Sequence, residues 1–280
     1  MATSSHQTLQ HHLEEFKAGR RRFENAFQAV ARMILDDDIQ KVVVNGKTTY
    51  DFSIFRTGDK PVIGMYDEIN SFVSYVKDAA EGGSSKEMAY VLVGEPGNGK
   101  TYFVDFLCQL YRRFLSQPEN RRYTFRFCHL DRFGTYGKIQ STESQTYEDP
   151  MVLAMNLAET PEESRTYLND RVGFDAALID KIYENYRPLG ACSEYIWNDI
   201  RRVNEGKLEK MLEHIEILPI PMTESLGTLT AKYPAKDKIT TSAVDLLGEE
   251  TIQRMLHISD TGNPVRFDLR RGALARVAGG

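Results

Sequence analysis

A glycine-rich octapeptide between an apolar run and an amphipathic segment constrains this chain more than any other feature. The octapeptide reads Gly94-Glu95-Pro96-Gly97-Asn98-Gly99-Lys100-Thr101. It fits the phosphate-binding loop (P-loop) pattern, in which a glycine and four further residues precede Gly-Lys-Thr. Residues 88–93 before it form a short apolar run that predicts a buried strand, and residues 101–111 after it predict a helix. A strand, a glycine-rich loop and a helix in this order predict a nucleotide-binding domain.

Each part of the loop has an expected role in holding a polyphosphate. Gly94, Gly97 and Gly99 allow positive φ angles and a close approach of the backbone, which a Cβ atom would obstruct. The loop amides then point inward, and the helix N-terminus adds a partial positive charge. Lys100 is expected to reach the β and γ phosphates, and the Thr101 hydroxyl to bind Mg²⁺. The expected nucleotide-binding residues of this segment are Gly94, Glu95, Pro96, Gly97, Asn98, Gly99, Lys100, Thr101 and Tyr102.

Composition narrows the class of protein. The 280 residues suffice for one large domain or two small ones, and 41% hydrophobic and 27% charged residues are usual for a globular protein. The net charge of -5 argues against a nucleic-acid partner, which favours a basic surface. No apolar stretch approaches the roughly 20 residues that span a bilayer, and no signal-peptide core is present. Because the cysteines are odd in number and far apart, we expect a reduced, cytoplasmic protein.

Apolar periodicity predicts the elements before the loop. A helix is expected over residues 11–35, interrupted by the arginines at 20–22, which we interpret as a solvated face or, alternatively, as a contact with a partner or phosphate. A β-hairpin is expected over residues 42–52, because its Asn45-Gly46 dipeptide suits a tight type I′ turn. The helix that follows should bury one apolar face, formed by Ile69, Phe72, Val73 and Val76.

Beyond the loop the pattern alternates between strands and helices. Strands are expected over residues 121–130 and 214–219, with a polar loop at 134–150 and a helical region at 160–213 between them. Residues 242–257 should contain one or two short helices. The fold class that we expect is therefore α/β.

A P-loop enzyme that hydrolyses nucleotide also needs a carboxylate at the end of a neighbouring strand, where it orients Mg²⁺. Asp131 is the nearest candidate for this catalytic and metal role, although Arg126 and His129 interrupt the apolar run before it. A strand-end or turn residue is the favoured alternative for Asp131. Asp180 and Asp245 lie in helical patterns and are weaker candidates. We therefore expect the acidic partner to lie beyond residue 280.

Several segments together resemble the PrkA family, bacterial proteins known as serine protein kinases and built on an AAA+ ATPase core. The segments are Gly64-Met65 with the helix after it, the P-loop, Asp149-Pro150-Met151 and Arg270-Arg271-Gly272-Ala273-Leu274-Ala275-Arg276. The resemblance covers roughly residues 55–280. It implies a P-loop NTPase core over 55–280, a parallel sheet flanked by helices with a helical insertion, preceded by a helix-and-hairpin extension over 1–54.

The resemblance also implies features that the residues alone do not give. In that family the acidic pair follows almost directly after the segment where this sequence stops, which implies a truncated chain without the acidic pair, the helical lid and the kinase-like region. AAA+ proteins often form rings in which an arginine reaches the neighbouring subunit's nucleotide, so a homo-oligomer of the full-length protein is expected. Candidates for that arginine are Arg270, Arg271 and Arg276. The family places Val62, Ile63 and Gly64 beside the adenine, the alternative being a plain packed strand end.

Three functions fit these observations. The chain is expected to bind ATP and Mg²⁺ and to use them either as a serine protein kinase, a transferase, or as an AAA+ ATPase coupled to remodelling or proteolysis of a protein partner. A regulatory module that senses nucleotide is the third. The lysine, catalytic-loop and metal-binding motifs of eukaryotic-type kinases are absent, and the P-loop alone does not separate the three. For this chain we expect ATP binding with poor hydrolysis.

Overall fold

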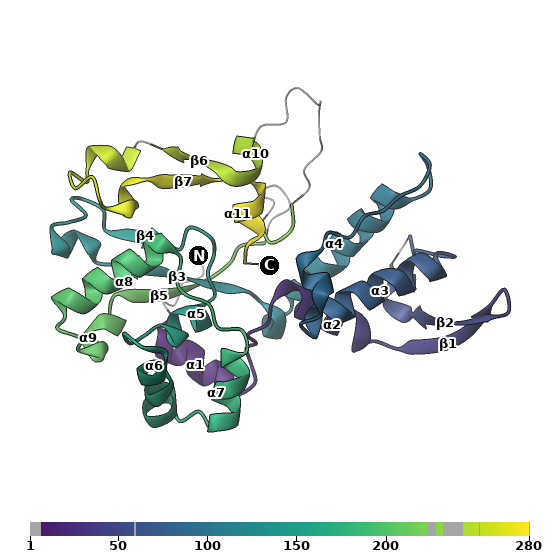
Figure 1. Cartoon of the computed structure of the whole chain (residues 1–280), viewed down its shortest axis with the longest axis horizontal. Coiled ribbons are helices and arrows are strands. Elements are labelled where there is room, and N and C mark those ends of the chain that lie inside the picture. The colour runs from purple at the N-terminus through teal and green to yellow at the C-terminus, as the bar shows by residue number, and fades with distance from the viewer. Residues whose placement is uncertain (1–6, 59, 223–227, 232–242, 252, 280) are drawn as a thin grey trace. The chain divides into compact units, whose positions relative to one another are not determined.

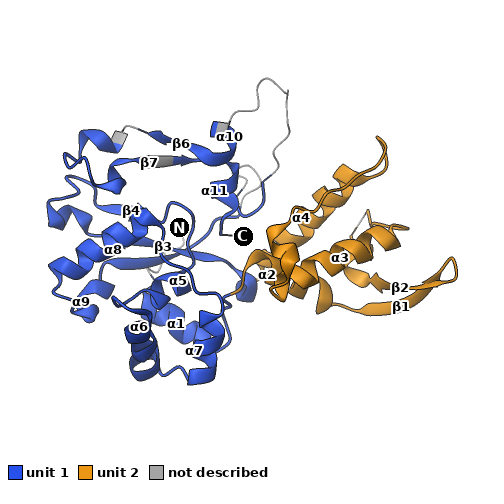
Figure 2. Cartoon of the chain, in the orientation of Figure 1, with its two compact units in different colours: residues 1–23, 118–280 blue, residues 24–117 orange. Residues whose placement is uncertain are grey.

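Helices and small antiparallel sheets make up a mixed α/β protein (Figure 1). The computed structural model describes residues 7–58, 60–222, 228–231, 243–251 and 253–279. The chain divides into two compact units, which Figure 2 colours separately. Unit 1 combines Met1–Phe23 with Pro118–Gly280, and unit 2 is Glu24–Gln117. The P-loop lies in unit 2, and each unit is described by itself. The expected boundary between residues 54 and 55 stays a prediction.

The expected single helix over residues 11–35 is wrong, because two local signals end one helix and start another. Helix α1 spans Leu9–Lys17 and belongs to unit 1, whereas α2 spans Ala26–Leu35 and belongs to unit 2. Gly19 ends α1 with a φ of 72°, a left-handed conformation that favours glycine. Asn25 starts α2 through a capping box with Gln28.

The arginine triplet between these helices is not a uniformly solvated face. Arg20 forms an exposed ion pair with Glu15 at 2.6 Å. Arg21 is buried in unit 1, where its guanidinium lies 4.0 Å from the centroid of the Tyr123 ring and hydrogen-bonds Gln7 and His12. The interpretation of Arg21 as a solvated residue is therefore wrong, and its charge holds the N-terminal segment against the sheet of unit 1.

Burial makes His12 a source of pH-dependent stability in unit 1. The ring is 2% exposed, and desolvation, reinforced by the charge of Arg21, lowers its pKa from 6.5 to about 3. Between these two pKa values the unfolded chain binds the proton that the folded chain excludes. Stability from this group is therefore fully present above pH 6.5 and falls as the pH drops toward 3.

We expect acid to destabilise unit 1 by about 2 kcal/mol through His12 between pH 7 and pH 5. His12→Asn keeps an acceptor for Arg21 but does not titrate in this window. Urea unfolding can be followed by the fluorescence of Trp197, the single tryptophan of the chain and a residue of unit 1. The difference between pH 7 and pH 5 should be smaller in the variant by that amount. An equal difference in both proteins would assign the acid sensitivity to other groups.

Unit 2 packs its helices and a hairpin around an aromatic core. Its elements are α2, β1 (Ile39–Val44), β2 (Lys47–Phe52), η1 (Ser53–Arg56), α3 (Tyr66–Ala80), η2 (Ser84–Glu87) and α4 (Lys100–Ser116). The hairpin prediction is confirmed, with φ angles of 51° at Asn45 and 77° at Gly46. The predicted helices are confirmed as α3 and α4, and Ile69, Phe72, Val73 and Val76 are buried as expected. Phe55 stacks on Phe103 of α4 at 5.9 Å, which joins η1 to the P-loop helix.

The run before the P-loop differs from its prediction. Residues 88–93 form no strand, and Val91 and Val93 are 72% and 90% exposed. The prediction of a buried strand is therefore wrong for this run. The β1–β2 hairpin is the sheet that the described part of unit 2 contains, and it offers this run no partner. Instead, Tyr75 donates a hydrogen bond to the Met88 carbonyl at 2.7 Å, and the Tyr90 ring packs on Phe72. Contacts with α3 therefore anchor the start of the run.

Unit 1 is built on a three-stranded antiparallel sheet with the order β4-β3-β5. Its strands are β3 (Tyr123–Cys128), β4 (Ser141–Glu143) and β5 (Ile215–Pro219), and β3 and β5 confirm two predicted strands. β4 lies within the stretch expected to be a loop. Helix α5 (Pro150–Met155) is completely buried, and the stack of Phe127 on Trp197 belongs to the same core.

The expected helical region is confirmed in unit 1. It consists of α6 (Pro161–Tyr167), a π-helical turn η5 (Leu168–Val172), α7 (Ala176–Tyr183), α8 (Ala191–Val203) and α9 (Leu208–Leu212). The remaining elements are η3 (Pro118–Asn120), η4 (Leu130–Phe133), α10 (Ala243–Leu247), β6 (Gly248–Thr251), η7 (Gln253–Leu256), η8 (Pro264–Arg266), β7 (Asp268–Arg271) and α11 (Ala273–Val277). α10 and η7 fulfil the expectation of short helices over 242–257, and β6 between them pairs with β7.

Candidate functional site

Two of the three loop glycines adopt the conformation that the P-loop requires. Gly97 has a φ of 89° and Gly99 a φ of 72°, both in the region that side chains with a Cβ rarely occupy. Gly94 is not among the residues with positive φ, and a Cβ there would meet Lys100 Nζ at an ordinary contact distance of 3.6 Å. The expectation of a positive φ at Gly94 is therefore wrong, whereas the expected close approach of its backbone to a phosphate stays a prediction.

Lys100 is folded back onto the loop. Its Nζ donates hydrogen bonds to the carbonyl oxygens of Gly94 at 2.7 Å and Glu95 at 2.6 Å. The residues from Gly94 to Asn98 are exposed, so this side chain closes an otherwise open turn. The ammonium group is thereby held at the mouth of the loop, next to the backbone that would surround a phosphate.

The start of α4 leaves its first amides for a ligand. The N-cap is Gly99, which has no side chain to accept a hydrogen bond from the first turn. Backbone N–H groups at such a terminus attract anions. Thr101 is exposed at the second position of the helix, and within the described residues its hydroxyl makes no hydrogen bond. The P-loop sequence thus places amides, a lysine and a free hydroxyl at one helix start.

The segment expected beside the adenine lies next to the same helix start. The Tyr102 hydroxyl donates a hydrogen bond to the carbonyl of Lys60, which draws the chain before Val62 to the first turn of α4. Val62 is 5% exposed and donates its N–H to Phe55 at 2.8 Å, so its side chain belongs to the packed core. Ile63 is 75% exposed and Gly64, with a φ of 81°, is also exposed. Of the three, these two are available for a ligand.

Asp131 is an exposed residue of η4, directly after the end of β3. It follows His129, whose φ of 61° turns the chain sharply out of the strand. Asp131 belongs to unit 1 and the P-loop to unit 2, so its metal role stays a prediction. Its position at a strand end agrees with the alternative of a turn residue.

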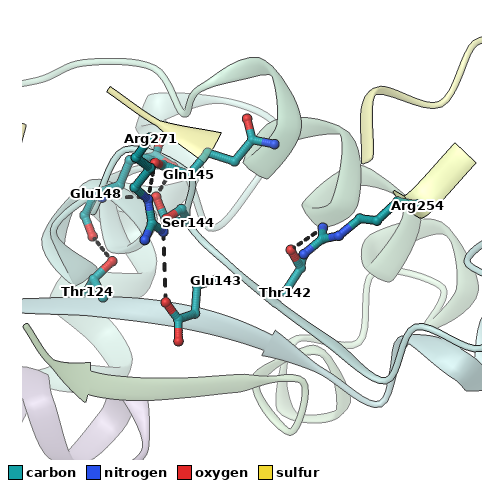
Figure 3. A network of polar contacts seen from close by, with 8 residues as sticks. All are labelled: Thr124, Thr142, Glu143, Ser144, Gln145, Glu148, Arg254 and Arg271. Carbon is teal, nitrogen blue, oxygen red and sulfur yellow. Dashed lines mark hydrogen bonds and ion pairs between the residues drawn. The ribbon is translucent and has the colours of Figure 1, made fainter. Parts of the chain in front are cut away.

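The three candidate arginines have different surroundings. Arg270 is 77% exposed and forms an ion pair with Glu249 at 3.0 Å. Arg271 is 22% exposed and donates to the carbonyls of Gln145 at 2.7 Å and Ser144 at 2.8 Å (Figure 3). Its guanidinium also stacks over the ring of Tyr147. Arg271 therefore fixes the loop before α5. Arg276 lies in α11 and is partly buried, so Arg270 is the exposed one of the three.

A buried polar network around Glu148 was not found from the sequence. Its Oε2 accepts hydrogen bonds from Ser144 at 2.7 Å and Ser193 at 2.5 Å, and its Oε1 accepts from the Gly190 amide at 2.7 Å. Its backbone carbonyl accepts from Thr124 at 3.0 Å (Figure 3). The carboxyl group thus ties the loop before α5 to the start of α8, and the backbone carbonyl of the same residue binds β3. No local pattern announces such a site, because its donors are up to 45 residues away.

A cavity of about 700 Å³ lies in unit 1 between the start of α1, η5 and α9. No P-loop residue lines it. Over the described ranges no group of three or more histidine, cysteine or acidic side chains is placed to hold a metal ion. None of the described helices combines the length and apolar character that a membrane crossing requires.

The comparisons with known proteins identify no relative. No protein-family model, no curated protein and no solved structure matches this chain. The functional argument therefore rests on the chain's own residues.

Proposed function

We propose that residues 94–101 bind ATP with Mg²⁺, and that the chain is the ATP-binding AAA+ domain of a PrkA-like protein. The observation that carries the proposal is the helix start at Lys100, with two left-handed glycines before it and an ammonium group bonded to the loop carbonyls. The resemblance over residues 55–280 supports the family assignment.

The Lys100 geometry suggests how phosphate enters the loop. The two carbonyl partners of Nζ are neutral acceptors, whereas β and γ phosphate oxygens are charged and accept stronger hydrogen bonds. We expect Lys100 to exchange the carbonyls of Gly94 and Glu95 for phosphate oxygens when nucleotide binds. The amides of the first turn of α4 would hold the same phosphates, and Thr101 would bind the metal ion.

The proposal includes the finer fold assignment, a parallel P-loop NTPase sheet flanked by helices. The order of apolar run, glycine loop and helix over residues 88–116 supports this assignment. The sheets in the described residues are antiparallel, so the parallel sheet is part of the proposal alone. In such a sheet a neighbouring strand would pair with this run, and helices packed on the sheet would cover the exposed Val91 and Val93. A homo-oligomer in which Arg270 approaches a neighbour's nucleotide belongs to the same proposal, since its side chain is exposed.

Two uses of ATP follow, and one experiment separates them. The first is phosphoryl transfer to a serine or threonine of a protein partner, and the second is hydrolysis coupled to remodelling or proteolysis. ATP labelled in its γ phosphate is incubated with the chain and a protein extract, with Lys100→Ala as the control. Label on serine or threonine that the variant lacks would support the kinase. Label released as free phosphate supports the ATPase, and bound but unreacted ATP supports a nucleotide sensor.

Thr101→Ala is expected to weaken the effect of Mg²⁺ on binding more than binding itself. The hydroxyl is the expected metal ligand, whereas the backbone amides and Lys100 remain in the variant. Titration calorimetry with ATP, with and without Mg²⁺, measures both quantities. An equal loss under the two conditions would contradict a metal-binding role for this hydroxyl.

A further inference from the structure

The two outer edges of the β1–β2 hairpin differ in whether their outward backbone groups are hydrogen-bonded within unit 2. In a two-residue hairpin the residues flanking the turn exchange hydrogen bonds, and every second pair does the same. Tyr50 is therefore a residue of β2 that directs its backbone groups outward. Its N–H and carbonyl are both bonded to the side chain of Asn70 from α3, at 3.2 and 2.7 Å. The Asn70 amide thus binds the outward backbone groups of Tyr50 in the way that a neighbouring strand would.

The outer edge of β1 is open. By the same alternation, Ile39, Lys41 and Val43 direct their backbone groups away from β2. In the described part of the chain no hydrogen bond reaches these outward groups. The side chain of Val43 is 71% exposed and that of Ile39 is 37% exposed. No proline or bulge protects the strand, and Lys41 is its single charge, so the edge can accept another strand.

Charges around β1 favour one kind of partner strand. Asp36, Asp37 and Asp38 are exposed immediately before the strand, and Lys47 lies just after the turn at its other end. Lys47 pairs with Asp67 at 3.2 Å, but both side chains are more than 70% exposed, at 74% and 77%, and such a pair is weak. The hairpin is therefore acidic at its base and basic at its tip. A second copy in antiparallel orientation brings each acidic base toward the other copy's basic tip.

We propose that β1 pairs antiparallel with β1 of a second copy of this chain, forming a four-stranded sheet across a two-fold axis at Val42. In this register Lys41 and Val43 of opposite copies exchange backbone hydrogen bonds, and Val42 faces Val42. The register keeps the two lysines apart and matches outward groups to outward groups. A parallel arrangement would instead place the aspartates of both copies together. The inference is independent of ATP binding.

The register is tested by disulfide formation. Val42→Cys places two thiols on directly opposed residues, whose Cβ atoms lie within reach of a disulfide. Gln40→Cys is the matched control on the same strand, because Gln40 of one copy lies about 14 Å along the strand from Gln40 of the other. Under mild oxidation, Val42→Cys should give a reducible dimer. Gln40→Cys and the unaltered chain, with its own cysteines, should give little.

The open edge is tested by Val43→Pro. Proline removes an outward N–H and leaves the bonds between β1 and β2 in place, as edge strands tolerate. Val43→Thr is the control, because it keeps the N–H and the branched Cβ. Light scattering over a range of concentrations should show dimers for the unaltered chain and for Val43→Thr, and salt should weaken this dimerisation. Val43→Pro should be monomeric, with a circular dichroism spectrum unchanged from that of the unaltered chain. A monomeric unaltered chain, or a dimer that Val43→Pro leaves intact, would overturn the proposal.

Discussion

Lys100→Ala is expected to reduce the affinity for ATP by more than about 100-fold, the effect of losing two charge-assisted contacts worth roughly 1.5–3 kcal/mol each. The ammonium group already lies at the loop, bonded to the carbonyls of Gly94 and Glu95, and no other lysine belongs to the octapeptide. Titration calorimetry of both proteins with ATP and Mg²⁺ measures the change.

The control must separate lost charge from a disturbed loop. Lys86→Ala removes an exposed lysine of η2 in the same unit and should leave ATP affinity unchanged. Lys100→Met keeps the length of the aliphatic side chain without the charge, so it should bind ATP as poorly as Lys100→Ala. Unchanged affinity in both Lys100 variants would remove the P-loop assignment, whatever the chain does otherwise.

Local signals account for the elements of unit 2 that sequence reasoning predicted. The Asn45-Gly46 turn and the apolar faces of α3 and α4 are determined by neighbours along the chain, and each is found where expected. The helix break was also readable, since Gly19 and the Asn25–Gln28 capping box are a stop and a start signal. The apolar periodicity continues on both sides of these two signals and therefore predicts one long helix.

Burial is where sequence reasoning failed. An apolar run such as residues 88–93 predicts a buried strand, but the run becomes one only where other strands pair with it and helices cover its faces. The prediction for Arg21 was wrong in the opposite sense. Three consecutive arginines predict a solvated face, but Arg21 is buried against the ring of Tyr123 and hydrogen-bonds the side chain of Gln7. Both outcomes depend on residues distant in sequence.

The candidate site shows the same division. The glycine conformations at 97 and 99 follow from the motif, since the loop can close in few ways. The carbonyl partners of Lys100 and the bond from Tyr102 to Lys60 do not follow from it. Glu148 lies outside any motif, because its role is created by Ser193 and Gly190 from a separate helix start.

Glu148→Ala is expected to destabilise unit 1 by about 3–5 kcal/mol, because it leaves two buried hydroxyls and a partly buried amide without their acceptor. Ser144 and Ser193 are 1% and 3% exposed, so water cannot readily replace the acceptor that their hydroxyls lose. Glu148→Gln should have an intermediate effect. Its amide oxygen can still accept from the Gly190 N–H, and the serine hydroxyls can rotate to accept from its new NH₂ group, but the charge is lost. Urea unfolding followed by Trp197 fluorescence reports on the unit that contains the network.

Glu143→Ala provides the matched control, because Glu143 is the last residue of β4, directly before the same loop. Glu143 is 44% exposed and its contact with Arg271 is long, at 3.8 Å, so its removal should change stability by no more than about 1 kcal/mol. Ser193→Ala removes a single donor from the network and should lie between the two. If Glu148→Ala unfolds at the same urea concentration as Glu143→Ala, the carboxyl group does not hold the loop before α5 to the start of α8. A large difference would identify this buried glutamate as the main polar support of the unit's core.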